Sequence, residues 1–137
     1  MDDYQRSDGA VYLIGLHIIW CPKYRKPLLV GPVAARLKEL LTAIADERGW
    51  RIEALEVMPD HVHVFVFVGP TDSAAVVARQ FKGRTSRILR DEFRQLRSRL
   101  PTLWSKSYFA TSVGRVSAAT VKRYIEEQTT KPTVGLP

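Results

Sequence analysis

Hydrophobic and polar positions alternate most clearly over residues 61–68, HVHVFVFV, and this pattern predicts a β-strand with valine on one face. Residues 51–58, RIEALEVM, alternate more weakly, and Pro59–Asp60 between the two segments are typical of a tight turn. The two segments are therefore predicted to pair as an antiparallel hairpin. Residues 10–20 are rich in β-branched and aromatic types and predict a further strand, which stops at Cys21–Pro22 because proline interrupts a ladder.

Three other segments have apolar residues at helical spacing. The first lies between Gly31–Pro32 and Gly49, and its apolar positions are Val33, Leu37, Leu40, Leu41, Ile44 and Ala45. The second runs from Ser73 to Leu100, with Gly83 as a candidate break. The third runs from Ala118 to about Thr129, with Ser117 as its predicted N-cap. A weaker strand pattern covers residues 103–113.

The predicted order is strand, helix, strand, strand, helix, strand, helix, which matches a split βαβ plan. We therefore expect an α+β, ferredoxin-like fold: an antiparallel sheet with helices on one face, plus an added C-terminal helix. The 137 residues suit one domain. Its core is expected over residues 10–130, with residues 1–9 and 131–137 as mobile tails.

Membrane insertion and disulfide chemistry are not expected. No apolar run approaches the roughly 18 residues of a membrane span, and the polar start, MDDYQRSDG, does not resemble an export signal, so cytoplasmic residence without a membrane partner is expected. Cys21 is the only cysteine, so one chain can form no internal disulfide and no cysteine-based zinc cluster. Any metal site must use histidine, carboxylate or amide ligands.

The net charge of +7 is concentrated in one part of the chain. Between residues 79 and 106 only Asp91 and Glu92 oppose nine basic side chains, namely Arg79, Lys82, Arg84, Arg87, Arg90, Arg94, Arg97, Arg99 and Lys106. A local excess of this kind is typical of a polyanion-binding surface, although a solvated helix face gives the same pattern. Arg87, Arg90, Arg94 and Arg97 have the spacing of one exposed helical stripe.

The histidine pair is the first candidate for chemistry. His61 and His63 are two residues apart on a predicted strand, so both imidazoles project from one face and can reach one cation. Two histidines bonded to ordinary protein partners fit the spacing equally well. His17 is isolated, and packing or a hydrogen bond explains it better than metal ligation. Asp60 either orients a ligand imidazole by accepting a hydrogen bond from it or simply makes the turn.

The last predicted helix carries a second candidate pair. Tyr124 and Gln128 fall on its apolar face with Val121 and Ile125, and residues four apart on a helix are neighbours. A tyrosine that caps the core is the more common explanation for such a position. A glutamine on the same buried face is costly without a polar partner, and a metal held by the two histidines would provide one.

These motifs resemble the single-tyrosine HUH transposases, small bacterial enzymes that move insertion sequences as single-stranded DNA. The resemblance rests on MPDHVHVFV at residues 58–66 and YIEEQ at residues 124–128. It also rests on HIIWCPKYR at residues 17–25 and FKG at residues 81–83. Together these segments follow the order of the family from residue 11 to residue 130.

The resemblance implies a reaction and a set of site residues. Tyr124 is then the nucleophile that attacks a DNA phosphate, leaving a 5′-phosphotyrosine bond and a free 3′-hydroxyl. His61, His63 and Gln128 are then the ligands of Mg²⁺ or Mn²⁺, although two imidazoles by themselves favour zinc or manganese over magnesium. It also implies hairpin-bearing DNA strand ends as substrate and a homodimer in which one protomer's tyrosine helix can serve the other's histidines. Lys122 and Arg123 are candidates for activating the phenol.

DNA contacts are expected from two basic regions. Trp20 or Tyr24 is a candidate for stacking on an unpaired base. The expected phosphate contacts are Lys23, Arg25, Lys26, Arg79, Lys82, Arg84, Arg87, Arg90 and Arg94. Three other functions remain open from the sequence: a domesticated repeat-associated transposase, a non-catalytic nucleic-acid-binding module with Phe65 and Phe67 on its sheet, and a histidine metallohydrolase that uses water.

Overall fold

The computed structural model describes residues 5–7, 9–98, 100–112 and 118–129. Its central sheet has four strands in the order β4-β5-β3-β6, and every neighbouring pair is antiparallel. These strands are β3 (Ile14–Trp20), β4 (Arg51–Met58), β5 (His61–Val68) and β6 (Phe109–Thr111). Together with the crossing helices, this strand order confirms the ferredoxin-like prediction.

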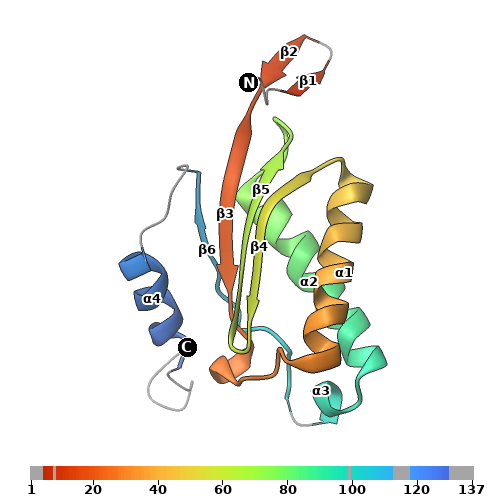
Figure 1. Ribbon diagram of the computed structural model, residues 1–137, viewed down its shortest axis with the longest axis vertical. Coiled ribbons are helices and arrows are strands. Elements are labelled where there is room, and N and C mark those ends of the chain that lie inside the picture. Colours follow the sequence, from red (N-terminus) through yellow and green to blue (C-terminus); the bar gives the residue numbers. More distant parts are fainter. Residues whose placement is uncertain (1–4, 8, 99, 113–117, 130–137) are drawn as a thin grey trace.

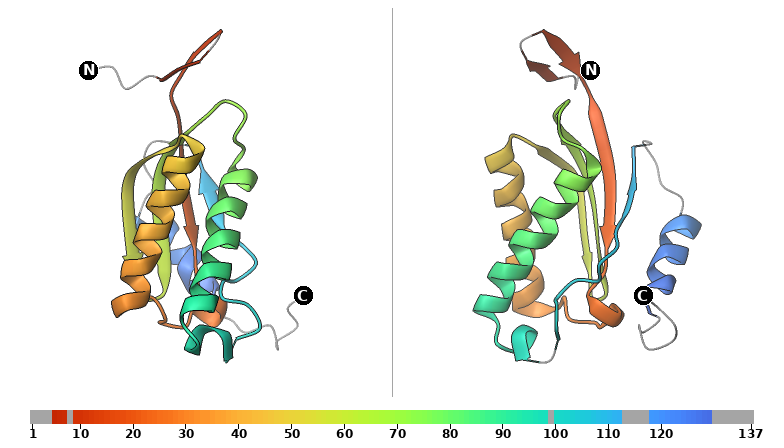
Figure 2. Two further views of the ribbon diagram at one scale, coloured as in Figure 1. Left: turned by 90° about the vertical axis from the view of Figure 1, so that its right-hand side faces the viewer. Right: turned by 180° about the vertical axis from the view of Figure 1, so that it is seen from behind.

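Helices α1 (Gly31–Arg48) and α2 (Ala74–Glu92) cover one face of the sheet, and α4 (Ala118–Glu127) lies on the other (Figures 1 and 2). The main core fills the first interface, where Val62, Val64, Val66 and Val68 of β5 are buried. Ile19, Cys21 and Ile125 form a smaller cluster beneath α4. Because both faces of β3 are covered, Leu16 to Trp20 are all buried.

Local signals explain how the helices begin and end. Pro32 occupies the first turn of α1, and Gly49 ends that helix in the left-handed conformation at φ 75°. Ser73 caps α2, because its hydroxyl accepts a hydrogen bond from the amide of Val76 at 3.1 Å. These are the boundaries that turn and capping residues predict.

The second helix corrects one expectation. Gly83 does not break it: α2 runs on to Glu92 and stops where Phe93 adopts an extended backbone, before the short α3 (Gln95–Ser98). A glycine costs a helix only about 1 kcal/mol, and packing of Phe81, Thr85 and Leu89 outweighs that cost. Arg94 and Arg97 therefore do not continue the helical stripe that begins at Arg87 and Arg90.

The ends of the chain also differ from expectation. The predicted strand over residues 10–20 is two strands, because β2 (Ala10–Tyr12) turns away from the sheet and pairs with β1 (Gln5–Ser7). This hairpin, part of which was expected to be a mobile tail, projects beyond the sheet (Figure 1). The strand expected over residues 103–113 is reduced to β6. Ser117 and residues 131–137 lie outside the described residues.

Candidate metal and strand-transfer site

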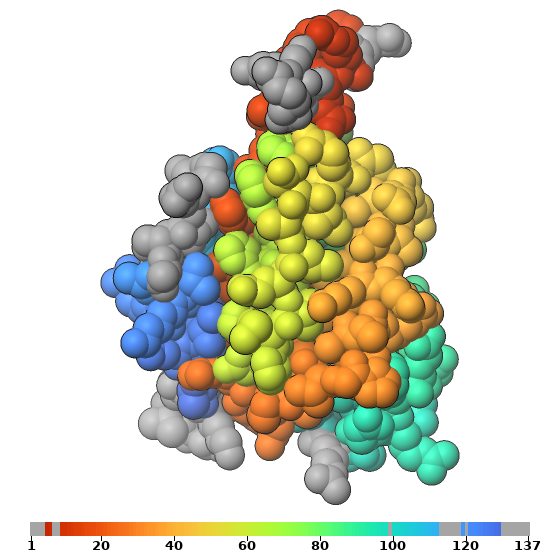
Figure 3. All heavy atoms as spheres, viewed as in Figure 1, coloured from red at the N-terminus to blue at the C-terminus, as the bar shows by residue number. Residues whose placement is uncertain are grey.

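The two histidines of β5 lie on the sheet face that α4 covers. Val62 between them is fully buried in the opposite core, while His61 and His63 are half-buried. The alternation of a strand produces this arrangement directly, so the prediction that both imidazoles share a face is confirmed. In Figure 3 the blue atoms of α4 lie directly beside the yellow-green atoms of the β4–β5 hairpin.

Asp60 orients the first imidazole. Its Oδ1 atom lies 3.0 Å from Nδ1 of His61, and its Oδ2 atom accepts a 2.7 Å hydrogen bond from Nε of Arg25. Burial opposes ionisation of Asp60, but the hydrogen bonds with Arg25 and His61 outweigh it and hold the pKa of this carboxyl below its ordinary value. With Nδ1 turned to the carboxylate, Nε2 of His61 is left for a ligand.

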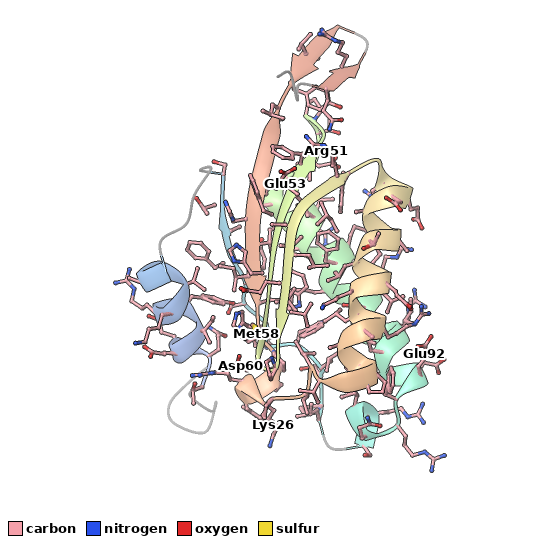
Figure 4. The ribbon with its side chains drawn as sticks, viewed as in Figure 1. Lys26, Arg51, Glu53, Met58, Asp60 and Glu92 are labelled. Carbon is pink, nitrogen blue, oxygen red and sulfur yellow. The ribbon has the colours of Figure 1, made fainter. Side chains whose placement is uncertain are left out.

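Arg25 belongs to a strained loop that lies beside the turn at Asp60. Figure 4 labels Asp60 and Lys26, the residue that follows Arg25. Tyr24 and Arg25, in the 3-10 turn η1 (Lys23–Arg25), have φ values of 60° and 57°, which non-glycine residues rarely adopt. The guanidinium of Arg25 also donates to Oγ1 of Thr129 at 2.7 Å. Arg25, predicted to contact DNA, thus joins the histidine turn to the end of the tyrosine helix.

The second imidazole has a histidine neighbour. Nε2 of His63 lies 3.0 Å from Nδ1 of His17, whose ring stacks on Phe65 at 4.2 Å between centroids. Burial, and then the proximity of His17, lower the pKa of His63, which favours the neutral imidazole. Metal ligation requires a neutral imidazole, and His63 therefore suits that role. His17 makes the hydrogen bond that sequence reasoning favoured for it.

An open pocket of about 540 Å³ lies between the histidines and α4. Its lining mixes acidic and basic side chains and comprises Arg25, Glu56, Asp60, His61, His63, Val121, Lys122, Ile125 and Glu126. Sequence reasoning missed Glu56 and Glu126. Glu56 pairs across the hairpin with His63, and its Oε1 atom lies 4.0 Å from Nε2 of His61, so the register of the hairpin is the signal that would have found it.

Tyr124 and Gln128 lie on the same face of the sheet, but they form hydrogen bonds with the segment before β6 and do not line the histidine pocket. The phenol oxygen of Tyr124 lies 3.1 Å from Oγ of Ser107. The Oε1 atom of Gln128 accepts hydrogen bonds from Ser105 at 3.2 Å and Ser107 at 3.1 Å. The polar partners expected for the glutamine are therefore serines here. Tyr124 packs against the cluster of Ile19, Cys21 and Ile125, and Ile19 is the cross-strand neighbour of His63.

The phenol is protonated in this environment. Burial raises the pKa of Tyr124 to about 12, against the opposing effect of its hydrogen bond with Ser107. Of the two cations considered as activators, Lys122 lines the histidine pocket and Arg123 is exposed. A nearby base, positive charge or metal ion is needed for the phenol to lose its proton at neutral pH.

The basic side chains fall into three groups. Arg84 forms a two-pronged ion pair with Glu47 of α1, and Lys82 donates to backbone carbonyls of residues 105–107. Lys26 and Arg79 are exposed, and the ammonium of Lys23 lies over the ring of Tyr24. A second open pocket, of about 670 Å³, is lined by Gly83, Ser86, Arg87, Ile88, Arg90, Asp91 and Arg97.

Trp20 is fully buried, so the prediction that it stacks on a base is wrong.

The fold and this site define a ferredoxin-like protein with a histidine pair and a tyrosine helix on one face of its sheet. Residues 10–128 match the family described as "Transposase IS200 like". The chain belongs to this family of transposases, enzymes that cleave DNA and transfer strands, and the resemblance noted in the sequence is confirmed. Among the described residues, no helix is long and apolar enough to cross a membrane.

Similar proteins agree with this assignment. The chain is 36% identical over 128 residues to the ISDra2 transposase TnpA of Deinococcus radiodurans, covering 92% of this chain and 91% of that protein. It is 26% identical over 121 residues to the transposase for insertion sequence element IS200 of Salmonella typhimurium, covering 87% and 79%.

Solved structures show the same fold. The crystal structure of a transposase-class protein from Deinococcus radiodurans R1 superposes with a TM-score of 0.83 at 35% identity, covering 90% of this chain and 97% of that one. A REP-associated tyrosine transposase bound to a REP hairpin superposes with a TM-score of 0.58 at 15% identity, covering 92% and 69%. At that identity the second likeness concerns the fold.

Proposed function

We propose that the chain cleaves and rejoins single-stranded DNA at hairpin-bearing element ends, with Tyr124 as the nucleophile and a divalent cation in the histidine pocket. The observation that carries the proposal is the arrangement of the covered sheet face. His61 and His63 point from β5 into an open pocket beneath α4, the helix that presents Tyr124, in a chain of the IS200-like family.

The residues around the pocket fit a divalent cation. Within the described ranges, no three histidine, cysteine or carboxylate side chains are grouped to hold a metal ion, and we infer a third protein ligand of another kind. The amide oxygen of Gln128 is that ligand in our proposal, beside His61 and His63, for Mg²⁺ or Mn²⁺. When bound, the ion polarises the phosphate and stabilises the charge that develops on its oxygens.

The side chains of the chain then have separate roles. The phenol of Tyr124 loses its proton and its oxygen forms a bond to the phosphorus, while the bond from the phosphorus to the 3′-oxygen of the neighbouring nucleotide breaks and that oxygen takes up a proton to become a free hydroxyl. The resulting phosphotyrosine ester keeps the energy of the broken bond for rejoining, which water-based hydrolysis does not. Asp60 and Arg25 hold the ring of His61, and the raised pKa of Tyr124 means that the phenol needs a base or a cation close by to lose its proton.

We propose further that the chain works as a homodimer. The amide of Gln128 is bonded to Ser105 and Ser107 rather than lining the histidine pocket of its own chain. It must therefore turn within its chain or serve the pocket of a partner. Mixing a His61→Ala chain with a Tyr124→Phe chain distinguishes these cases, because activity returns in the mixture only if the two residues act across protomers.

Adduct formation tests the proposed function. Labelled single-stranded oligonucleotides that carry hairpins flanking the gene, or repeat hairpins of the same genome, are incubated with Mn²⁺ and protein. We expect a covalent protein–DNA adduct with the wild type, and a loss on the order of 10⁴-fold or more in Tyr124→Phe with hairpin binding retained. Cutting by Tyr124→Phe at the wild-type rate would instead indicate a hydrolase that uses water.

A further inference from the structure

We propose that Lys82 is a positioning residue for strand transfer: its ammonium fixes the backbone of residues 105–107, and the serines of that segment hold Tyr124 and Gln128. This inference rests on the proposed function and adds a residue to it. Lys82 does not reach the reacting atoms; it acts through the segment.

The ammonium of Lys82 donates hydrogen bonds to three consecutive backbone carbonyls. Its Nζ atom donates to the backbone oxygens of Ser105 at 2.8 Å, Lys106 at 3.2 Å and Ser107 at 3.0 Å. The same atom lies 5.7 Å from the ring centroid of Tyr108. An ammonium has three N–H donors, and these three carbonyls use all of them. Few single side chains could hold three successive peptide groups in one conformation.

The segment that Lys82 holds is the one that binds the tyrosine helix. Ser107 Oγ contacts both the phenol of Tyr124 and the amide oxygen of Gln128, and Ser105 Oγ donates to the same amide oxygen. A serine hydroxyl carries one hydrogen, so when Ser107 donates to Gln128 it accepts the phenolic hydrogen of Tyr124. One hydroxyl thus links the proposed nucleophile to a proposed metal ligand.

Other contacts fix the start of the segment but not Lys106 and Ser107. The amide of Ser105 donates to the carbonyl of Cys21 at 2.9 Å, and the indole of Trp104 donates to Thr85 at 3.1 Å. Lys106 and Ser107 are exposed. At these two positions Lys82 therefore supplies the backbone contacts that tie the segment to the body of the protein.

These contacts argue against a phosphate contact for Lys82, which its place among the basic residues had predicted. Its three donors are occupied, and burial lowers its pKa to about 8. A phosphate would have to displace a carbonyl from a partly desolvated group. The exposed Arg79, one turn earlier on α2, has no such engagement with the segment among the described contacts.

Single-turnover adduct formation on the hairpin oligonucleotides tests the assignment. We expect Lys82→Met to slow the rate at saturating DNA about tenfold to a hundredfold, because misplacing a reacting group costs that much. Hairpin affinity and its salt dependence should match the wild type. Lys82→Arg, which keeps the charge and the N–H donors, should recover part of the rate. Lys38→Met, the same change at an exposed lysine of α1, is the matched control.

Two results would overturn the proposal. One is a wild-type adduct rate in Lys82→Met. The other is weaker binding with a flatter salt dependence and a normal rate at saturating DNA, which would make Lys82 a DNA contact. Ser107→Ala supplies a variant at an exposed position, where folding is not at risk. Ser107→Ala should slow adduct formation more than Ser105→Ala does. The double variant Lys82→Met with Ser107→Ala should be slowed by less than the product of the two single effects, because both residues act through one segment.

Hydrogen exchange separates this proposal from the proposed function. If the wild type forms no adduct, the proposed function fails, yet Lys82→Met should still accelerate amide exchange over residues 105–111 and leave α1 unchanged. Unchanged exchange over residues 105–111 would mean that Lys82 does not fix the segment, whatever the chemistry of the site.

Discussion

Nε2 of His63 lies 3.0 Å from Nδ1 of His17, and the two residues belong to neighbouring strands. One ring must donate and the other accept, so each imidazole restricts the tautomer of the other. His17 is separated from His63 by 46 positions in the chain. The sheet thus places a third histidine beside the pair, within hydrogen-bond distance of the ring of His63.

Metal dependence should follow from this arrangement. His61→Ala and Gln128→Ala are each expected to weaken Mn²⁺-dependent cutting, and His17→Phe to lower the affinity for Mn²⁺ about tenfold while keeping the ring stacked on Phe65. Titration of adduct formation with Mn²⁺ measures these changes. An unaltered Mn²⁺ requirement in both ligand variants would remove the proposed site.

Salt dependence should locate the phosphate contacts. Arg87 and Arg90 line the second pocket, and Nη1 of Arg90 is buried there without a hydrogen-bond partner among the described residues. Replacing both with alanine should reduce the slope of log affinity against log salt by about 1 to 2, since each phosphate contact to a single strand contributes about 0.7. Lys38→Ala is the control, and an equal slope in the double variant would move the contact surface elsewhere.

The stability of the fold should depend on one buried threonine. Thr85 is fully buried, donates to the carbonyl of Phe81 at 2.6 Å and accepts from the indole of Trp104 at 3.1 Å. Thr85→Val should lower the free energy of unfolding by about 1–3 kcal/mol, because the indole N–H is left buried without a partner. Urea denaturation measures it. Thr42→Val, at an exposed position, should change it by less than about 0.5 kcal/mol, and an equal loss in both variants would contradict the explanation.

The pH dependence of stability should report on Lys82. Its pKa is lowered from the ordinary value of 10.5 to about 8 in the folded chain, because burial disfavours the ammonium. Between these values the unfolded chain holds a proton that the folded chain has released, so the free energy of unfolding rises with pH. Over this interval the wild type should gain stability relative to Lys82→Met, and below pH 8 the difference should stay level. If the stability of the wild type relative to Lys82→Met fell above pH 8, the pKa of Lys82 would be raised in the folded chain rather than lowered.

Local sequence patterns were enough to predict many of the strands and helices of this protein. The period-two alternation of residues 61–68 placed His61 and His63 on one face, and the turn at Pro59–Asp60 fixed the hairpin. Helical spacing placed α1 and α4 within a few residues of their ends. These features depend on neighbours in sequence, and the resemblance carried by MPDHVHVFV and YIEEQ named the family without any long-range contact.

Tertiary packing decided the rest, because it joins residues that no local period relates. Lys82 reaches carbonyls 23 to 25 positions away, and Ser105 and Ser107 donate to Gln128 from 23 and 21 positions away, so neither serine carried a signal in the sequence. Gly83 looked like a helix break, yet burial of the side chains around it kept α2 continuous. The sequence by itself determines which residues have the required chemistry, whereas the tertiary structure determines their partners, because hydrogen bonds depend on distance in space.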